Sequence, residues 1–535
     1  MSKKLDTDID FNFNVFETVE RALPIKPMIN IGSCLDIPTC TVELGMKDES
    51  IINGGLGNFT GAAGKGNTFK TTVLDGMIYI GMERISSFAP ANYLAYDTEV
   101  NNNERHQSYR ISNFKYLKKL HPVESGLFRY SDKVSEAGNK FYDKLMTVLR
   151  GKSAKDTKTK MVATPFKYRD TGKPLMVPMP SGGKIDSLSD FTVEADAKNL
   201  AENELGDSGG NTLFMRNALM KTRMMLELPE WLIRSSHYLG MVSQVGDEVA
   251  MASGPTPPAP KKQLQDMKNG QILKGVGSKF TFATTICWNM IKATPMWNGY
   301  KPTDGALYPI ESGANKTSND NDLYEVEMKC IRNKNGPTGF IVNAVVSQSK
   351  GLLGSLTEFH FIKSNNYFGL IGSNQNYVSA LMPEVKLQRT TIRTKLNENP
   401  RLARSINIMS ELLQFNQMKP QYVEGIWCDM ETLYSDLKKM GYDWNELLDT
   451  RGWWAFNQYD HPEFFLSSID LLRMRAGLYV PYWMDPQTKR ASKEYLDRRQ
   501  AARDRLELIY SHYEKYGNKE TQVDYESEEN IIEAV

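Results

Sequence analysis

The stretch Gly64-Lys-Gly-Asn-Thr-Phe-Lys-Thr-Thr72 carries the strongest signal in this chain for its fold and chemistry. It has the spacing of a phosphate-binding loop: a glycine, four residues, one further position, and then Lys-Thr. In such a loop the backbone N–H groups cradle phosphates, a lysine reaches the β- and γ-phosphates, and a hydroxyl holds Mg²⁺. The spacing therefore predicts ATP and Mg²⁺ as cofactors, held by Gly64, Asn67, Thr68, Phe69, Lys70, Thr71 and Thr72, with Thr71 on the metal.

One position departs from this motif. Phe69 stands where the standard loop has a second glycine. The alternative interpretation is a glycine-rich turn in which Lys70 and Thr71 fall at the right spacing by chance.

The sequence around the loop predicts an α/β domain. From about residue 50 to 350, short apolar runs alternate with helix-like runs and Gly-rich turns, as in a domain with a central sheet. From about residue 380 the apolar spacing becomes helical, and 491–516 is a clear example. The expected strands are Asn92–Tyr96, Leu239–Ser243, Phe280–Trp288, Leu323–Ile331 and Phe340–Val346.

Three further expectations are local. Lys152–Lys160 and Ala252–Lys262 are predicted to be long loops, the second because it is rich in proline. A helix is expected from about Thr212 to Leu228, ending at Pro229. Trp453-Trp454 and Tyr482-Trp483 are either core residues or a base-stacking surface, and core is favoured.

Composition excludes some classes of function. The chain has 535 residues, 65 Lys+Arg and 64 Asp+Glu, so a nucleic-acid surface must be local. Five cysteines without a CxxC pair, and six scattered histidines, argue against a zinc module. Neither an apolar signal core nor a membrane-spanning run is present in the sequence, so we expect a cytoplasmic protein without a membrane partner.

A strand ending in acids follows the loop. Tyr93-Leu-Ala-Tyr-Asp97-Thr98-Glu99 places carboxylates at the carboxyl edge of the expected sheet, beside the phosphate loop. There Glu99 is the candidate that polarises the attacking water. The alternative is a strand followed by an acidic cap.

Several segments, in order, resemble the RecA family of ATPases. They are Ile31-Gly32-Ser33 with Asp36-Ile37, Gly54-Gly55-Leu56, the phosphate loop, the strand ending at Glu99, Lys184-Ile-Asp186-Ser187, Glu204-Leu-Gly-Asp-Ser208, Leu239–Gln244 and Gly275–Phe280. The Phe69-Lys70 pair resembles the loop of UvsX-type phage recombinases in particular.

The resemblance implies roles for individual residues. Asp186 is expected to act on Mg²⁺ through water, Gln244 to sense the γ-phosphate, and Lys279 to reach the ATP of a neighbouring subunit. DNA contacts are expected in two loops and on the helix between them, from Gly206, Asp207, Ser208, Gly209, Arg216, Arg223, Lys261 and Lys262. Catalysis is assigned to Glu99, Lys70 and Gln244.

The resemblance also implies an architecture. We expect a RecA-type P-loop core with a mostly parallel sheet at 49–375, after a subunit-docking segment at 1–48. A helical C-terminal domain at 376–519 and an acidic tail at 520–535 complete the prediction. The implied activity is a DNA-dependent ATPase that forms helical filaments on single-stranded DNA and pairs it with homologous duplex. The alternatives are a hexameric replicative helicase on the same core and an ATP-binding regulatory protein without turnover.

Overall fold

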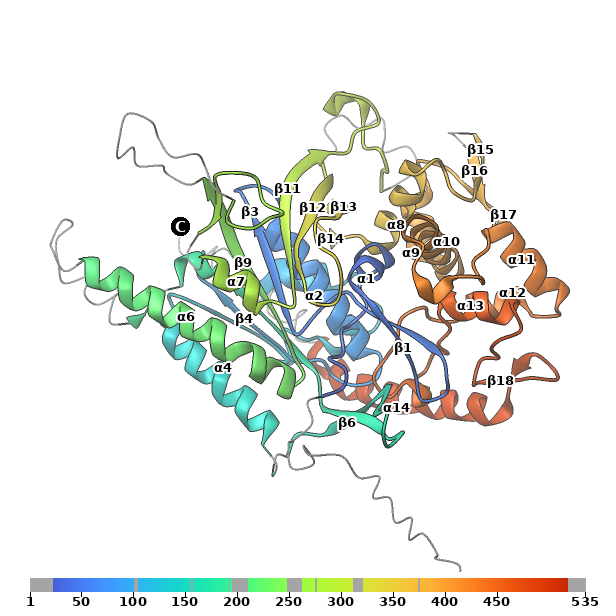
Figure 1. Cartoon of the computed structure of the whole chain (residues 1–535), viewed down its shortest axis with the longest axis horizontal. Coiled ribbons are helices and arrows are strands. Elements are labelled where there is room, and N and C mark those ends of the chain that lie inside the picture. The colour runs from blue at the N-terminus through green and yellow to red at the C-terminus, as the bar shows by residue number, and fades with distance from the viewer. Residues whose placement is uncertain are drawn as a thin grey trace, which may run out of the picture.

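The computed structural model describes residues 23–100, 104–154, 156, 158–191, 193–194, 210–247, 262–274, 277–310, 321–373 and 376–517. Most of the chain before residue 353 surrounds one large mixed sheet (Figure 1). In order across the sheet the strands are β14 (Gly351–Leu352), β13 (Ile341–Ser347), β12 (Leu323–Asn333), β11 (Ile286–Pro295), β3 (Phe59–Gly64), β9 (His237–Asp247), β8 (Ser181–Asp186), β4 (Tyr93–Asp97) and β5 (Phe128–Asp132).

The strands from β11 to β5 are all parallel, whereas β12, β13 and β14 extend the sheet antiparallel. A short strand, β10 (Gln271–Leu273), returns antiparallel against the end of β9. The prediction of an α/β fold with a central, mostly parallel sheet is confirmed.

Helices cover both faces of the sheet. Helix α2 (Lys70–Ser86) packs on one face, and α4 (Gly138–Ser153), α6 (Gly210–Arg234) and α7 (Gly277–Ala283) pack on the other, as Figure 1 shows for the α4–α6 pair. Side chains of β3 point alternately to the two faces of the sheet. Ala62 packs in the core around α2, whereas Phe59 and Ala63 pack in the core on the opposite face.

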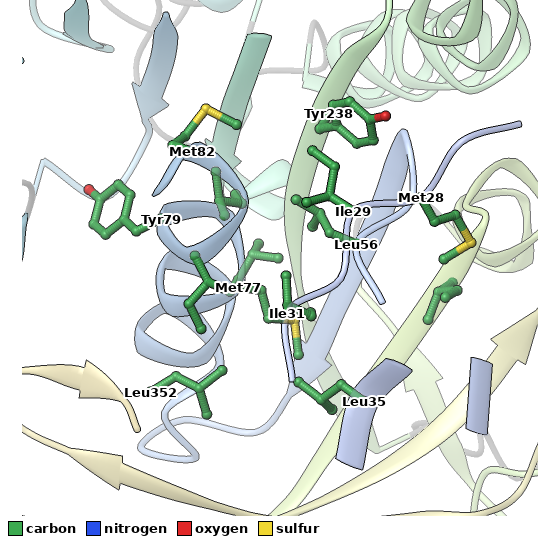
Figure 2. Close-up of a cluster of buried hydrophobic side chains, with 14 of the residues drawn as sticks. Met28, Ile29, Ile31, Leu35, Leu56, Met77, Tyr79, Met82, Tyr238 and Leu352 are labelled. Carbon is green, nitrogen blue, oxygen red and sulfur yellow. The ribbon is translucent and has the colours of Figure 1, made fainter. Parts of the chain in front are cut away.

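The core around α2 joins the N-terminal segment to the sheet. Figure 2 shows Met77 and Met82 of α2 on the same side of the sheet as Ile29, Ile31 and Leu56. All five side chains are buried. Burial on this scale fixes the helix that begins at Lys70 against the strand that ends at Gly64.

The chain after residue 353 is mainly helical. It comprises α8 (Gly354–Ser364), α9 (Ile392–Glu398), α10 (Pro400–Met418), α11 (Met430–Lys439), α12 (Trp444–Leu448), α13 (Ser468–Arg475), α14 (Lys493–Gly517) and a small sheet of β15 (Leu370–Ser373), β16 (Asn376–Ser379) and β17 (Met382–Leu387). Its core is shared with Leu323 and Val345 from the large sheet and with Met296, which directly follows β11. The predicted domain boundary at 375/376 falls within the small sheet.

The described chain also contains several short α-helices and strands. They are α1 (Ser33–Asp36), β1 (Thr41–Leu44), β2 (Ser50–Asn53), α3 (Glu104–Ile111), β6 (Met161–Lys167), β7 (Pro174–Pro178), β18 (Met484–Asp485) and β19 (Arg490–Ala491). Along the described helices, none has the length and apolarity needed to cross a membrane.

Most expected elements are present. The strands predicted near residues 92, 239, 323 and 340 and the long helix near 491 are confirmed as β4, β9, β12, β13 and α14. The core interpretation of the tryptophan pairs is confirmed for Trp454 and Trp483, which are buried.

Two expectations about the elements were wrong. Phe280–Trp288 is not one strand, because α7 runs to Ala283 and β11 begins at Ile286. Helix α6 continues through Pro229 to Arg234, because buried Leu228 and Leu232 pack on either side of the proline and offset its missing N–H.

The predicted loop at Lys152–Lys160 is confirmed for its described residues after Ser153, while its first two residues belong to α4. The Lys152 amine donates to Ser181 Oγ at 2.6 Å, and burial lowers its pKa to about 7. The first lysine of this polar stretch is therefore partly buried.

Candidate nucleotide-binding site

The predicted phosphate loop connects β3 directly to the first turn of α2. Gly64 ends the strand and Lys70 begins the helix, so Lys70, Thr71 and Thr72 lie at the helix N-terminus, where N–H groups and the helix dipole favour anions. A Cβ on Gly64 would lie 2.5 Å from Thr68 Oγ1, so close packing requires glycine at this position.

Two residues of the loop have left-handed backbone conformations. Asn67 has φ 58° and Phe69 has φ 60°, and alternation of this kind turns successive N–H groups toward one concave side. The loop is closed by a hydrogen bond from Thr68 Oγ1 to the Lys65 carbonyl, at 2.9 Å. Both features are typical of a backbone cradle for an anion.

The structure explains the departure at Phe69. The positive φ of this residue is the conformation for which glycine is ordinarily required. The Phe69 ring packs on the Tyr324 ring of β12, with 4.7 Å between ring centroids. An aromatic contact of this type contributes about 1 kcal/mol, which offsets a comparable backbone cost.

Carboxylates gather at the carboxyl ends of β4 and β8. Asp97 and Asp186 are direct neighbours in the parallel register, and both are buried. Thr98 connects the two strand ends, since its Oγ1 donates to the Ser187 carbonyl at 2.9 Å and accepts from the Ser187 N–H at 2.7 Å. Two acidic strand ends are thereby held side by side.

A buried charge network connects these strand ends to α2. The Lys184 ammonium lies 2.7 Å from Asp75 Oδ1 and 3.6 Å from Asp186 Oδ2. Arg110 contacts Asp75 Oδ2 at 3.3 Å and Thr72 Oγ1 at 3.5 Å. Burial lowers the pKa of Lys184, but Asp75 and Asp186 outweigh it and leave that pKa raised.

Asp186 is suited to the role expected of it beside Mg²⁺. Its Oδ1 is buried and accepts no hydrogen bond from the described residues, so an acceptor is left over for a metal-bound water. Thr71, at the start of α2, supplies the expected hydroxyl. No cluster of three or more His, Cys, Asp or Glu suited to a metal occurs among the residues that the structure describes.

The other expected catalytic residues lie at the same edge of the sheet. Glu99 follows the end of β4, where its N–H donates to Asp97 Oδ1 at 2.8 Å. Gln244 is paired in register with Gly64. The expectation that the strand ends at Gln244 was wrong, because β9 continues to Asp247 and β10 pairs back against it.

The expected DNA-contacting residues are only partly described. Gly206, Asp207, Ser208, Gly209, Lys261 and the acidic tail at 520–535 lie outside the described residues, as does the side chain of Arg216. Arg223 is exposed on α6 and pairs with Glu227 at 2.7 Å. Lys262 and Lys279 are exposed, and Lys279 lies in α7 rather than in a strand.

Sequence reasoning missed the buried cations. Lys184 and Arg110 have no motif spacing of their own, and Asp75 lies within a helix whose other residues are mostly apolar. The one available signal was Lys184 two residues before Asp186, since alternation in a strand puts both side chains on one face.

Comparison with known proteins adds little to this geometry. No family model matches the chain, and no curated protein matches it. Among solved structures, one described as an ATPase domain is similar over 56% of this chain and 84% of its own length, with 10% identity and a TM-score of 0.29. A likeness at this level carries no argument about function.

Proposed function

We propose that this chain is a RecA-type ATPase that binds ATP with Mg²⁺ between β3 and α2. The observation that carries the proposal is the convergence of a strand–loop–helix anion cradle with two acidic strand ends on one edge of a parallel sheet. Ligands of open α/β sheets bind at this edge, beyond the carboxyl ends of the strands.

Each side chain has a defined task in this proposal. Lys70 neutralises the β- and γ-phosphates, and Thr71 with Asp186 holds the hydrated Mg²⁺. The metal supplies charge neutralisation on the phosphate oxygens. Glu99 accepts a proton from the attacking water, while Gln244, on the strand beside the loop, detects the γ-phosphate.

We further propose that ATP binding favours assembly on single-stranded DNA, as a recombinase that pairs homologous strands. What supports this finer proposal is the ordered resemblance of the sequence to the RecA family, with Gln244 on the strand that leads toward the second expected DNA loop. A γ-phosphate bound beside Gln244 would then change the affinity of that loop for DNA.

Calorimetry on two variants tests the nucleotide site. Lys70→Ala should remove measurable ATP binding, because no other cation lies at that spacing in the loop. Glu99→Gln should keep ATP binding and lower turnover by about 10²–10⁴, the usual contribution of a general base. Unchanged ATP affinity in Lys70→Ala would place the phosphates elsewhere.

Electron microscopy tests the finer proposal. The full chain is imaged with single-stranded DNA and a non-hydrolysable ATP analogue, with the Lys70→Ala variant as the matched control. Helical filaments that the control lacks would support the recombinase. Closed rings would favour the helicase, and isolated protomers the regulatory protein.

A further inference from the structure

A large cavity with many charged side chains in its lining lies far from the phosphate loop, at the other end of α2. Its volume is about 740 Å³, within the range of sites that hold small molecules. The walls come from the end of α2, from β14 and α8, from α10, from the 448–453 segment and from α14. The cavity therefore lies where the sheet domain meets the C-terminal helices.

Six carboxylates line this cavity: Asp36, Glu83, Glu358, Glu411, Asp449 and Glu463. Five of them already accept hydrogen bonds or ion pairs from the protein, three from backbone N–H groups and the other two from Arg401 and Lys115. Of the six, as far as the described residues show, Glu411 keeps a buried oxygen, Oε2, without a partner. Cations therefore balance two of the six charges, and neutral N–H donors stabilise three others.

The basic side chains of the lining are engaged differently. Arg393, Arg404 and Arg451 are buried and donate to protein acceptors. The remaining four form no ion pair with any carboxylate among the described residues: Arg84, Lys350, Arg499 and Arg503. Six of the seven lining cations and four of the six lining carboxylates have no ion pair among the described residues, and this excess of cations favours an anionic occupant.

Arg84 keeps one donor atom available, while four lining carboxylates, Glu83 foremost, already act on its charge. Its guanidinium lies 4.1 Å above the Trp453 ring, which fixes its plane. Its buried Nε donates to no group in the described part of the chain. A fixed guanidinium with a free donor is a ready partner for an oxyanion.

Two further cations lie together on α14. Arg499 and Arg503 are four residues apart, hence on one face of the helix. Arg503 donates through Nε to the Pro462 carbonyl at 3.2 Å, a neutral acceptor that leaves its charge unpaired. Burial and the neighbouring Arg503 lower the pKa of Arg499, and a bound anion would relieve that repulsion.

We propose that this cavity binds a small molecule bearing phosphate, held by Arg84, Lys350, Arg499 and Arg503. Guanidinium groups match phosphate oxygens in pairs, and a site with several of them suits a multiply charged ligand better than a single carboxylate. This site is separate from the proposed ATP site, since Arg84 lies 14 residues, about 21 Å along the helix, from Lys70.

The test is calorimetric titration of the full chain carrying Lys70→Ala, a substitution that under the proposed function removes phosphate binding at the loop. The probes are inorganic phosphate and AMP at constant ionic strength. Saturable binding is expected, with affinity at least tenfold weaker when Arg84→Gln or Arg503→Gln is added. Arg505→Gln, an exposed arginine on the same helix and outside the lining, should bind like the parent.

The two probes separate the sources of phosphate. Tighter binding of AMP would identify a nucleoside phosphate, and equal binding would identify phosphate itself as the determinant. Absence of saturable binding by either probe, or equal weakening by Arg503→Gln and Arg505→Gln, would overturn the proposal. Because Arg503 is exposed, its variant keeps the test valid even if Arg84→Gln fails to fold.

Discussion

At the scale of single residues, Phe69 shows how packing sustains an unfavourable backbone conformation. Its φ of 60° is strained for any residue with a Cβ, yet its ring contact with Tyr324 anchors the end of the phosphate loop to β12. Phe69 departs from the standard motif, and its side chain also anchors the end of the loop to β12.

Two substitutions separate the strain from the contact. Phe69→Ala loses the ring contact and keeps the strain, whereas Phe69→Gly loses the contact and relieves the strain. We expect Phe69→Gly to be more stable than Phe69→Ala by about 1 kcal/mol, measured by urea unfolding. Equal stability of the two variants would show that the φ of this residue costs nothing.

Glu411 makes stability depend on pH. Burial raises its pKa from 4.5 to about 7, Arg404 on the same helix opposes that rise, and Glu358 of α8 adds to it. Above pH 4.5 the unfolded chain releases the proton that the folded chain retains, so this group lowers stability as pH rises from about 4.5 to about 7.

Glu411→Gln should remove this dependence. Relative to the parent, the variant should gain about 3 kcal/mol in unfolding free energy between about pH 4 and pH 8. Any effect of the substitution on packing is the same at both pH values, so it cancels when the unfolding free energy at one pH is subtracted from that at the other. A parent and variant whose unfolding free energies run parallel over this range would contradict the assignment to Glu411.

At the scale of elements, β8 shows why an apolar pattern is not needed for a central strand. Its sequence is Ser-Gly-Gly-Lys-Ile-Asp, yet it lies between β9 and β4 with most of its residues buried. The glycines allow close approach, since a Cβ on Gly182 would lie 2.6 Å from Met82 Cε and one on Gly183 would lie 2.8 Å from the Leu94 carbonyl.

These two glycines provide a matched pair of variants. Met82 Cε is the end of a flexible side chain and can move, whereas the Leu94 carbonyl belongs to the neighbouring strand and cannot. Gly183→Ala should therefore destabilise the fold by about 1–3 kcal/mol more than Gly182→Ala, as measured by thermal or urea unfolding. The reverse order would show that the β4–β8 spacing can relax.

At the scale of the whole molecule, the sheet and the C-terminal helices share one hydrophobic cluster. Leu323 and Val345 of the sheet, with Met296 just after β11, pack with residues of α8, α10 and α13. Trp454 also bonds back to the N-terminal segment, its Nε1 donating to the Met28 carbonyl at 2.8 Å. The helices therefore act as part of the structural core.

Truncation tests whether the sheet domain depends on the C-terminal helices for its fold. A chain ending at residue 391 should be insoluble or lack a cooperative unfolding transition, because it exposes the apolar faces that α10 and α13 cover. The full chain, treated identically, is the control. A truncated chain that unfolds cooperatively and keeps its ATP affinity would show that the sheet domain is independent.

The sequence by itself determined the features that depend on local spacing. Strand alternation in β12, helical periodicity in α14 and the Gly64–Thr72 spacing are set within a few residues, and each element occurs where that spacing predicts it. The positions of Glu99, Asp186 and Gln244 at one edge follow from strands that run parallel. Their catalytic roles remain predictions.

Only the tertiary structure decided what depends on distant neighbours. Pro229 stays inside a helix because that helix buries Leu228 and Leu232, and β8 is a central strand because its glycines fit beneath Met82 and beside Leu94. The ion pairs of Lys184 and the cations gathered around Arg84 require charges brought together from separate elements. Burial and electrostatics act through space, so no local pattern in the chain records them.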